Sequence, residues 1–228
     1  MKGMAKPLFD ISPFTLLDYP NKAACIFWFA GCNMRCLYCY NPDIVLGKGK
    51  IGIDEAKLFL QSRRGLLQAV VFSGGECSMH PDLMKLAKIA KEMGYLIKVD
   101  TNGTRPKVLK AMYEEGLLDY VALDFKALSP KYKEITLFDD FKSFEQSLEF
   151  LISTRLTFEV RTTVHGQLLS NDDLQEMLFF LEGKGYVGNY YLQAALNNVK
   201  TLSDLSYSSF GKEKINFSSR NIQVIIRA

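Results

Sequence analysis

The chain has 228 residues, 48% of them hydrophobic, so it is long enough to bury a substantial core within one domain. Its 28 Lys and Arg residues against 25 Asp and Glu give a net charge of +3, which is too weak and too diffuse to indicate a nucleic-acid partner. No apolar run approaches the length of a membrane span and no charged leader precedes an apolar segment, so we expect a cytoplasmic protein without a membrane partner.

The first predicted strand is the apolar run 23–29, which is short and continuous, as buried strands of parallel sheets tend to be. It follows the turn-like series 18–21, and its thiol, Cys25, is best explained as core packing. A helix is predicted from Asp54 to about Arg64, and 69–72 is the next strand.

Helices and strands continue to alternate along the rest of the chain. The helices are predicted at 81–93, 104–115, 144–151 and 170–181, and the strands at 96–99, 120–123, 158–164 and 190–192, with 221–226 as a closing strand. About six such alternations predict a parallel sheet with right-handed crossovers. Because polar segments follow strand after strand instead of gathering at one switch point, we expect an α/β fold of the partial TIM-barrel type, (β/α)6, with the helices outside.

Three of the five cysteines lie within eight residues, Cys32, Cys36 and Cys39, in the spacing C-x3-C-x2-C. An odd number of cysteines with three crowded together favours metal ligation over disulfides. Structural zinc sites and ordinary clusters take four protein ligands, so one position is left open here. Two alternatives follow: a 4Fe-4S cluster with one iron free to bind a small molecule, or a zinc knuckle whose fourth ligand lies elsewhere. Cys77 is a candidate for that fourth ligand, and is otherwise inert.

Polar groups follow each later strand, where the active site of a β/α barrel is built. They are Ser73-Gly74-Gly75-Glu76, Asp100-Thr101-Asn102-Gly103, Asp124-Phe125-Lys126, Arg161 with His165, and Gln193. Paired glycines permit close backbone approach to a ligand, and Glu76 can accept hydrogen bonds from a ligand ammonium group. Lys126 and Arg161 can pair with a ligand carboxylate.

Three of these groups, Asp100, Thr101 and Asp124, are oxygen donors that either cap the next helix or bind a cation. His165 is one of only 2 histidines, and a hydrogen-bonded loop histidine is its simplest interpretation. The strand ends therefore predict one site that binds a ligand carrying both charges.

Taken in order, several segments resemble the radical S-adenosylmethionine activating enzymes, specifically the anaerobic ribonucleoside-triphosphate reductase activating protein family. These segments are FTLLDYP (14–20), CNMRCLYCYNP (32–42), SGGE (73–76) with HPDL (80–83), DTNG (100–103), LDFKA (123–127) and VRTTV (160–164). The resemblance implies a single radical SAM domain over 1–228, with a core at about 14–196 and a C-terminal extension at 197–228.

The resemblance also implies the cofactors, a 4Fe-4S cluster and S-adenosyl-L-methionine. By it, Cys32, Cys36 and Cys39 bind the cluster, Gly74, Gly75 and Glu76 hold the methionine end of S-adenosylmethionine, Tyr38 lies near the adenine, and Asp100, Thr101, Asn102, Lys126, Arg161 and His165 complete the pocket. The implied reaction is reductive cleavage of S-adenosylmethionine to methionine and a 5'-deoxyadenosyl radical, which takes a hydrogen atom from a glycine of a partner enzyme. That partner is an anaerobic ribonucleotide reductase, and the electron comes from a one-electron donor such as flavodoxin or ferredoxin.

Two positions depart from the family pattern. Many relatives have His where this chain has Tyr40, and the glycine motif usually continues with Pro where Cys77 stands. Two other functions remain open at the level of sequence: a small-molecule enzyme resembling 7-carboxy-7-deazaguanine synthase, and a non-enzymatic zinc-binding module.

Overall fold

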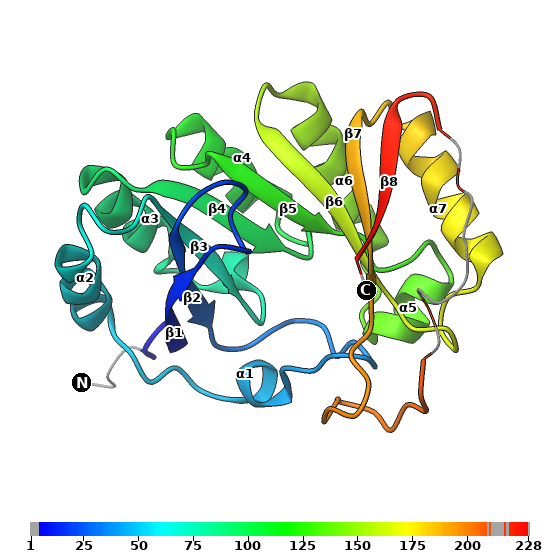
Figure 1. The fold of residues 1–228 in the computed structure, drawn as a ribbon, viewed down its shortest axis with the longest axis horizontal. Helices are drawn as coiled ribbons and strands as arrows, with labels where there is room; N and C mark the ends of the chain where they lie inside the picture. Colours follow the sequence, from blue (N-terminus) through cyan, green and yellow to red (C-terminus); the bar gives the residue numbers. More distant parts are fainter. Residues whose placement is uncertain (1–4, 209, 211–216, 218, 228) are drawn as a thin grey trace. The chain divides into compact units, whose positions relative to one another are not determined.

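A computed structural model describes residues 5–208, 210, 217 and 219–227 (Figure 1). Eight strands follow one another along a mostly parallel sheet in chain order. The strands are β1 (Leu8–Thr15), β2 (Ala24–Phe29), β3 (Ala69–Gly74), β4 (Leu96–Thr101), β5 (Tyr120–Asp124), β6 (Thr157–Val164), β7 (Gly188–Ala194) and β8 (Ile222–Arg227). The helices are α1 (Pro42–Leu46), α2 (Ile53–Ser62), the short η1 (Cys77–Met79), α3 (Leu83–Glu92), α4 (Pro106–Glu114), α5 (Lys131–Thr136), α6 (Phe141–Ser153) and α7 (Asn171–Gly183).

Each predicted strand is confirmed with small shifts at its ends, and so is the α/β class of the partial barrel type. The sequence missed β1, which pairs antiparallel with β2. Pro13 lies within this strand, and an edge strand tolerates proline because one side of it needs no ladder donors. Two short helices, α1 and α5, were also missed.

The described residues fall into two compact units, which we describe separately. The first unit comprises the chain up to Asn33 together with Asn41–Thr101 and Lys107–Val121, and the second comprises Met34–Tyr40, Asn102–Pro106 and the chain from Ala122 on. The expectation of a single domain over 1–228 stays a prediction, and part of the extension 197–228 lies outside the described residues.

The core of the first unit forms on both faces of β2 and β3, since alternate residues of a strand point to opposite sides. Ala24 and Ile26 pack on one face with Ala69 and Val71 in a single buried cluster. On the other face the fully buried Phe27 lies 6.1 Å, centroid to centroid, from Phe59 of α2. Burial on both sides explains why this stretch of sequence is apolar without interruption.

Aromatic side chains dominate the core of the second unit. Phe125, directly after β5, stacks on Phe144 of α6 at 4.8 Å and lies 5.6 Å from Phe180 of α7. At the edge of this unit the Arg227 guanidinium lies 3.5 Å over the Tyr191 ring, a contact that joins β8 to β7. The contacts of Phe125 fix the end of β5, which carries Asp124.

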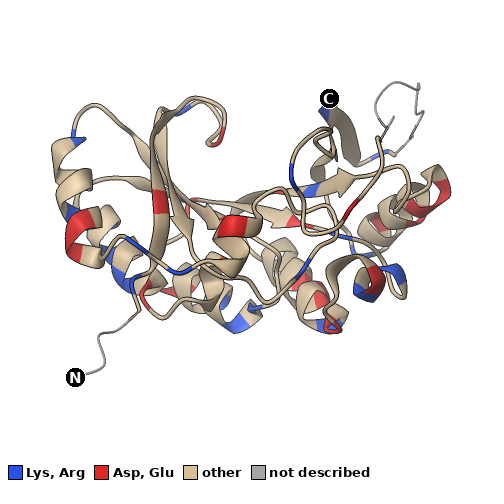
Figure 2. Ribbon diagram, turned by 90° about the horizontal axis from the view of Figure 1, so that it is seen from below, with Lys and Arg blue, Asp and Glu red and all other residues tan. Residues whose placement is uncertain are grey.

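Charges of both signs are interspersed along the ribbon, as the composition predicted (Figure 2). Lys184, for example, lies 2.5 Å from Glu145 and 2.6 Å from Glu149. Among the described helices, none is both long and apolar enough to cross a membrane.

Candidate active site

The loop that follows β2 carries the three crowded thiols. Cys32 belongs to the first unit, whereas Cys36 and Cys39 belong to the second. In the second unit the amide of Arg35 donates to the Thr136 carbonyl at 2.8 Å, and the amide of Leu37 donates to the Ile135 carbonyl at 3.0 Å. Helix α5, absent from the predicted elements, therefore supports the backbone next to Cys36.

Three of the five thiols, Cys25, Cys36 and Cys77, are buried, and their surroundings differ. Burial raises the pKa of Cys36 to about 11, although the nearby Lys126 ammonium acts against the shift. Burial also raises the pKa of Cys25 to about 12, and its Sγ lies against the Ala69 carbonyl, as expected for core packing. Cys77 is fully buried, and its thiol donates to the carbonyls of Phe72 and Asp100 at 3.6 and 3.5 Å. Burial, followed by the charges of Glu76 and Asp100, raises the Cys77 pKa well above its usual value, so this thiol stays protonated within the core.

Across the described residues, no three His, Cys, Asp or Glu side chains converge on a single ion. Thiolates are ligands of both zinc and 4Fe-4S clusters, so the donor chemistry of the loop fits either group. The choice between them comes from the comparisons reported below.

Gly74 and Gly75 bring the end of β3 against the protein's own backbone. Gly74 has a φ of +119°, and a Cβ there would overlap the backbone of Phe29. A Cβ on Gly75 would overlap the carbonyl oxygen of Gly31. The amide of Glu76 donates to that same oxygen at 2.9 Å. The glycines thus allow the turn after β3 to pack directly against the backbone that leads to Cys32, a role that the sequence did not predict. Their contact with a ligand stays a prediction.

Glu76 is 2% exposed and is held from several directions. Its Oε1 accepts hydrogen bonds from the Ser78 amide at 3.1 Å, from the Ser78 hydroxyl at 2.5 Å and from the Thr101 hydroxyl at 2.8 Å. Such donors orient a carboxylate without neutralising its charge. These donors therefore hold the Glu76 carboxyl group in one orientation.

Asp100, in contrast, is already paired within the first unit. Its Oδ1 lies 2.5 Å from the ammonium of Lys98, which is 2% exposed, and its Oδ2 accepts from Ser73 at 3.4 Å. The two residues are i and i+2 on β4 and so lie on one face of the strand. This ion pair makes Asp100 a compensated charge, and a role for it in binding a cofactor stays a prediction.

The second unit gathers Asp124, Lys126 and Arg161. Asp124 Oδ2 lies 3.2 Å from Lys126 Nζ, while Oδ1 accepts from Arg161 Nε at 3.0 Å and lies 2.9 Å from its terminal nitrogen. Burial would raise the pKa of Asp124, but Arg161 and Lys126 outweigh it and hold that pKa below its ordinary value. Burial would lower the pKa of Lys126, but Asp124 holds it well above the ordinary value. Asp124 is thus shared between an ammonium and a guanidinium group.

Tyr38 lies beside this charge cluster. Its ring centroid is 5.9 Å from Lys126 Nζ, and the residue is only 6% exposed. Its hydroxyl is buried and has no hydrogen-bond partner among the described residues. A ligand with a polar edge would supply that partner. Burial also raises the Tyr38 pKa, so the hydroxyl is a donor.

Two of the predicted cofactor residues have their polar atoms occupied by protein. Asn102 Oδ1 accepts from the amide of Thr104 at 3.1 Å and from its hydroxyl at 2.6 Å. His165 Nε2 lies 2.9 Å from the Ser206 carbonyl, and its Nδ1 accepts from the amide of Gln167 at 3.3 Å. The structure therefore gives both residues loop-holding contacts, and their contact with a cofactor stays a prediction.

The sequence did not single out Ser78 and gave Asp124 only the role of a cap or cation ligand. Asp124 was recognisable as a neighbour of Lys126, because only one residue separates the two at the end of a predicted strand. The bonds from Ser78 to Glu76 depend on the turn η1, for which no sequence signal was available.

Known proteins give independent information on the same residues. The radical SAM superfamily model matches residues 26–181. A protein of Methanocaldococcus jannaschii, whose name assigns it provisionally to the glycyl-radical enzyme activating enzymes, is 32% identical over 183 residues, which are 78% of this chain and 75% of that protein. The pyruvate formate-lyase-activating enzyme of Clostridium pasteurianum is 35% identical over 147 residues, 58% of this chain and 60% of that enzyme.

The fold has counterparts among solved structures. QueE from Escherichia coli superimposes with a TM-score of 0.54 over 84% of each chain at 15% sequence identity. At that identity the likeness concerns the fold alone, and it agrees with a partial barrel in which helices accompany a mostly parallel sheet.

Proposed function

Because the chain belongs to the radical SAM superfamily, and is therefore a radical SAM enzyme with a 4Fe-4S cluster and S-adenosylmethionine as its cofactors, we propose that it activates a glycyl radical enzyme. The observation that carries this proposal is the 32% identity with the Methanocaldococcus protein, which extends over three quarters of both chains. Membership of this family removes the zinc-binding module from consideration.

The partner we propose is an anaerobic ribonucleoside-triphosphate reductase. The support is the order and spacing of the six motifs between Phe14 and Val164, which resemble the activating proteins of that enzyme. The electron would come from a small one-electron donor such as flavodoxin or ferredoxin.

Cys32, Cys36 and Cys39 are the proposed ligands of the cluster, which when bound supplies the electron that cleaves S-adenosylmethionine. The support is their spacing and the fact that the other two thiols, Cys25 and Cys77, are buried against backbone carbonyls. Three thiolates leave one iron without a protein ligand, and that iron is the proposed position for the methionine end of the cofactor.

The two charge clusters suit the two charges of that methionine end. Glu76 is the proposed acceptor for its ammonium group, because its carboxyl group is buried and is oriented by the Ser78 amide and the Thr101 hydroxyl. Lys126 with Arg161 is the proposed partner for its carboxylate, because their ammonium and guanidinium groups lie together around Asp124. Tyr38 is proposed to contact the adenine, and Gly74 and Gly75 to line the methionine end beside Glu76.

The test is anaerobic. Reduced protein, S-adenosylmethionine and the host's anaerobic reductase are mixed, and the electron paramagnetic resonance spectrum is recorded. A glycyl doublet on the reductase that is absent with the Cys36→Ala protein is the expected result. A protein that cleaves the cofactor yet leaves the reductase and every other glycyl radical enzyme of the host without a radical would contradict the proposal and favour a small-molecule substrate.

A further inference from the structure

The segment 197–208 contacts the loop that carries Cys36 and Cys39, and nothing in the family match covers it, since that match ends at 181. The amide of Leu202 donates to the Cys39 carbonyl at 3.1 Å, and the amide of Ser203 donates to the Leu37 carbonyl at 3.2 Å. Both bonds are backbone to backbone, so they depend on where the segment runs and not on its side chains. They lie within the second unit.

The cysteine loop is thereby bonded along both sides. Residues 135–136 of α5 accept from the amides of Arg35 and Leu37, while 202–203 donate to the carbonyls of Leu37 and Cys39. Leu37 uses its donor on one side and its acceptor on the other. The position of the backbone between Cys36 and Cys39 therefore depends on the position of 202–203.

What holds 202–203 in place is the loop that follows β6. His165 Nε2 donates to the Ser206 carbonyl at 2.9 Å, because its Nδ1 accepts from the Gln167 amide and so carries no proton. The Gln167 side-chain oxygen accepts from the Ser206 amide at 3.3 Å. Ser206 is thus held by hydrogen bonds at both its carbonyl and its amide.

The two ends of the segment are also joined to each other. Asn197 donates through Nδ2 to the Ser208 carbonyl at 2.9 Å and accepts through Oδ1 from the Ser208 amide at 2.8 Å. The Ser208 hydroxyl in turn accepts from the Gly166 amide at 3.0 Å. Segment 197–208 is therefore a closed loop. Ser206 and Ser208 are hydrogen-bonded to residues 165–167, and residues 202–203 are hydrogen-bonded to the cysteine loop.

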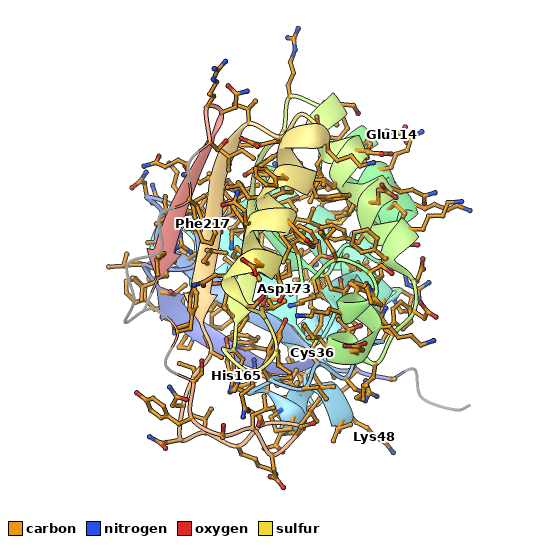
Figure 3. The ribbon with its side chains drawn as sticks, turned by 90° about the vertical axis from the view of Figure 1, so that its right-hand side faces the viewer. Cys36, Lys48, Glu114, His165, Asp173 and Phe217 are labelled. Carbon is orange, nitrogen blue, oxygen red and sulfur yellow. The ribbon has the colours of Figure 1, made fainter. Side chains whose placement is uncertain are left out.

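This closed loop also walls a cavity of about 170 Å³, which is lined by Tyr38, His165 and residues between Ala195 and Tyr207. Figure 3 shows His165 and Cys36 at the end of this unit where that segment runs. Movement of the segment would open the side of the cysteine loop on which Tyr38 is buried.

We propose that segment 197–208 is a latch that fixes the Cys36–Cys39 loop, and that His165 and Gln167 are positioning residues for it. The proposal rests on the proposed role of the cysteines as cluster ligands. It gives His165 a role through the cluster loop, which is different from direct contact with the cofactor.

The test uses the whole 228-residue chain with its cluster, in the absence of S-adenosylmethionine. His165→Phe removes the donor to Ser206, while His165→Gln restores an amide donor at a similar reach. We expect the Phe variant to lose its visible absorbance to a chelator about tenfold faster than wild type, since about 1.4 kcal/mol of hydrogen bonding is removed. We also expect altered g values in the spectrum of its reduced cluster, and near-wild-type behaviour in the Gln variant.

Gln167→Ala provides a second variant that does not threaten folding, because Gln167 is exposed. It should accelerate cluster loss about threefold, since one weakly buried bond is lost. The exposed Asp204, within the same segment, gives the matched control, and Asp204→Ala should behave as wild type. The latch is refuted if the His165→Phe and Gln167→Ala proteins lose their visible absorbance at the wild-type rate and show wild-type g values. It is also refuted if the His165→Gln protein loses its cluster as fast as the His165→Phe protein does. A cluster retained in Cys36→Ala would instead refute the ligand assignment, so the two failures are distinguishable.

Discussion

The two units provide opposite kinds of charged group. In the first, the Glu76 carboxylate accepts hydrogen bonds from hydroxyl and amide donors, whereas Asp100 is paired with Lys98. In the second, Asp124 is shared between Lys126 and Arg161. Under the proposed function, Glu76 of the first unit binds the ammonium of S-adenosylmethionine, and the cations of the second unit bind its carboxylate. Four predictions, taken from the largest effect to the smallest, test this division.

The largest effect is expected at the loop that passes from one unit to the other. Replacing Cys32, Cys36 or Cys39 singly with Ala should abolish the broad visible absorbance of the reconstituted cluster, because each thiolate binds its own iron. Cys25→Ala and Cys77→Ala are the matched controls and should keep it, since their thiols bond backbone carbonyls. Loss of the cluster in Cys77→Ala would mean that the open coordination position has been misassigned.

Next come the two charges proposed to hold the cofactor. Glu76→Gln and Lys126→Met should each weaken S-adenosylmethionine binding about thirtyfold or more, because losing a charged partner from a site shielded from water costs about 2 kcal/mol. Equilibrium binding to the cluster-loaded proteins measures this. Glu92→Gln and Lys142→Met, both exposed, are the controls. Normal affinity in either site variant would contradict the division of charge between the units.

Asp124 should make the second unit sensitive to acid. Its folded pKa is lowered, so its ionic bonds contribute stability above its ordinary pKa of about 3.9, and that stability is lost as the pH falls through the lower folded value. We expect Asp124→Asn to lower the free energy of unfolding by about 2 kcal/mol at pH 7. The difference from wild type should shrink below about pH 4. Urea denaturation at several pH values measures it, and a difference that does not change with pH would show that the charge of Asp124 is not responsible.

The smallest expected effect concerns how Glu76 is held. Ser78→Ala removes one of the three donors to Oε1 and should weaken S-adenosylmethionine binding about fivefold, the equivalent of about 1 kcal/mol, while the cluster is retained. Thr101→Val, which removes another donor, should act to a similar degree. If both variants bind the cofactor as tightly as wild type, orientation of Glu76 by these hydroxyls is unimportant.

Much of this arrangement was predictable from sequence, because the signals are local. Apolar runs bounded by turns predicted the strands. Glu76 and Lys126 were then singled out because active-site residues of a β/α barrel follow the carboxyl ends of its strands. Other features depend on contacts distant in sequence. The pairing of β1 with β2, the support of Leu37 by α5 and the bond from His165 to Ser206 all involve backbone groups, which every residue type possesses and which therefore leave no pattern to recognise.

The role of the glycines shows where local interpretation falls short. Gly74 and Gly75 indicated room for a ligand, and the structure shows that a side chain there would meet the backbone of Phe29 and Gly31. A glycine pair signals close approach, but the approaching group is identified only once the neighbouring loop has been placed.

The most direct test of the central claim uses a ligand that lacks one of its charges. Affinities of the wild-type, Lys126→Met and Glu76→Gln proteins are measured for S-adenosylmethionine and for its decarboxylated analogue. The wild type should prefer S-adenosylmethionine about thirtyfold, Glu76→Gln should keep that preference, and Lys126→Met should lose most of it, because only the second unit binds the carboxylate. A preference that survives unchanged in Lys126→Met, or that disappears in Glu76→Gln, would contradict the assignment of opposite charges to the two units.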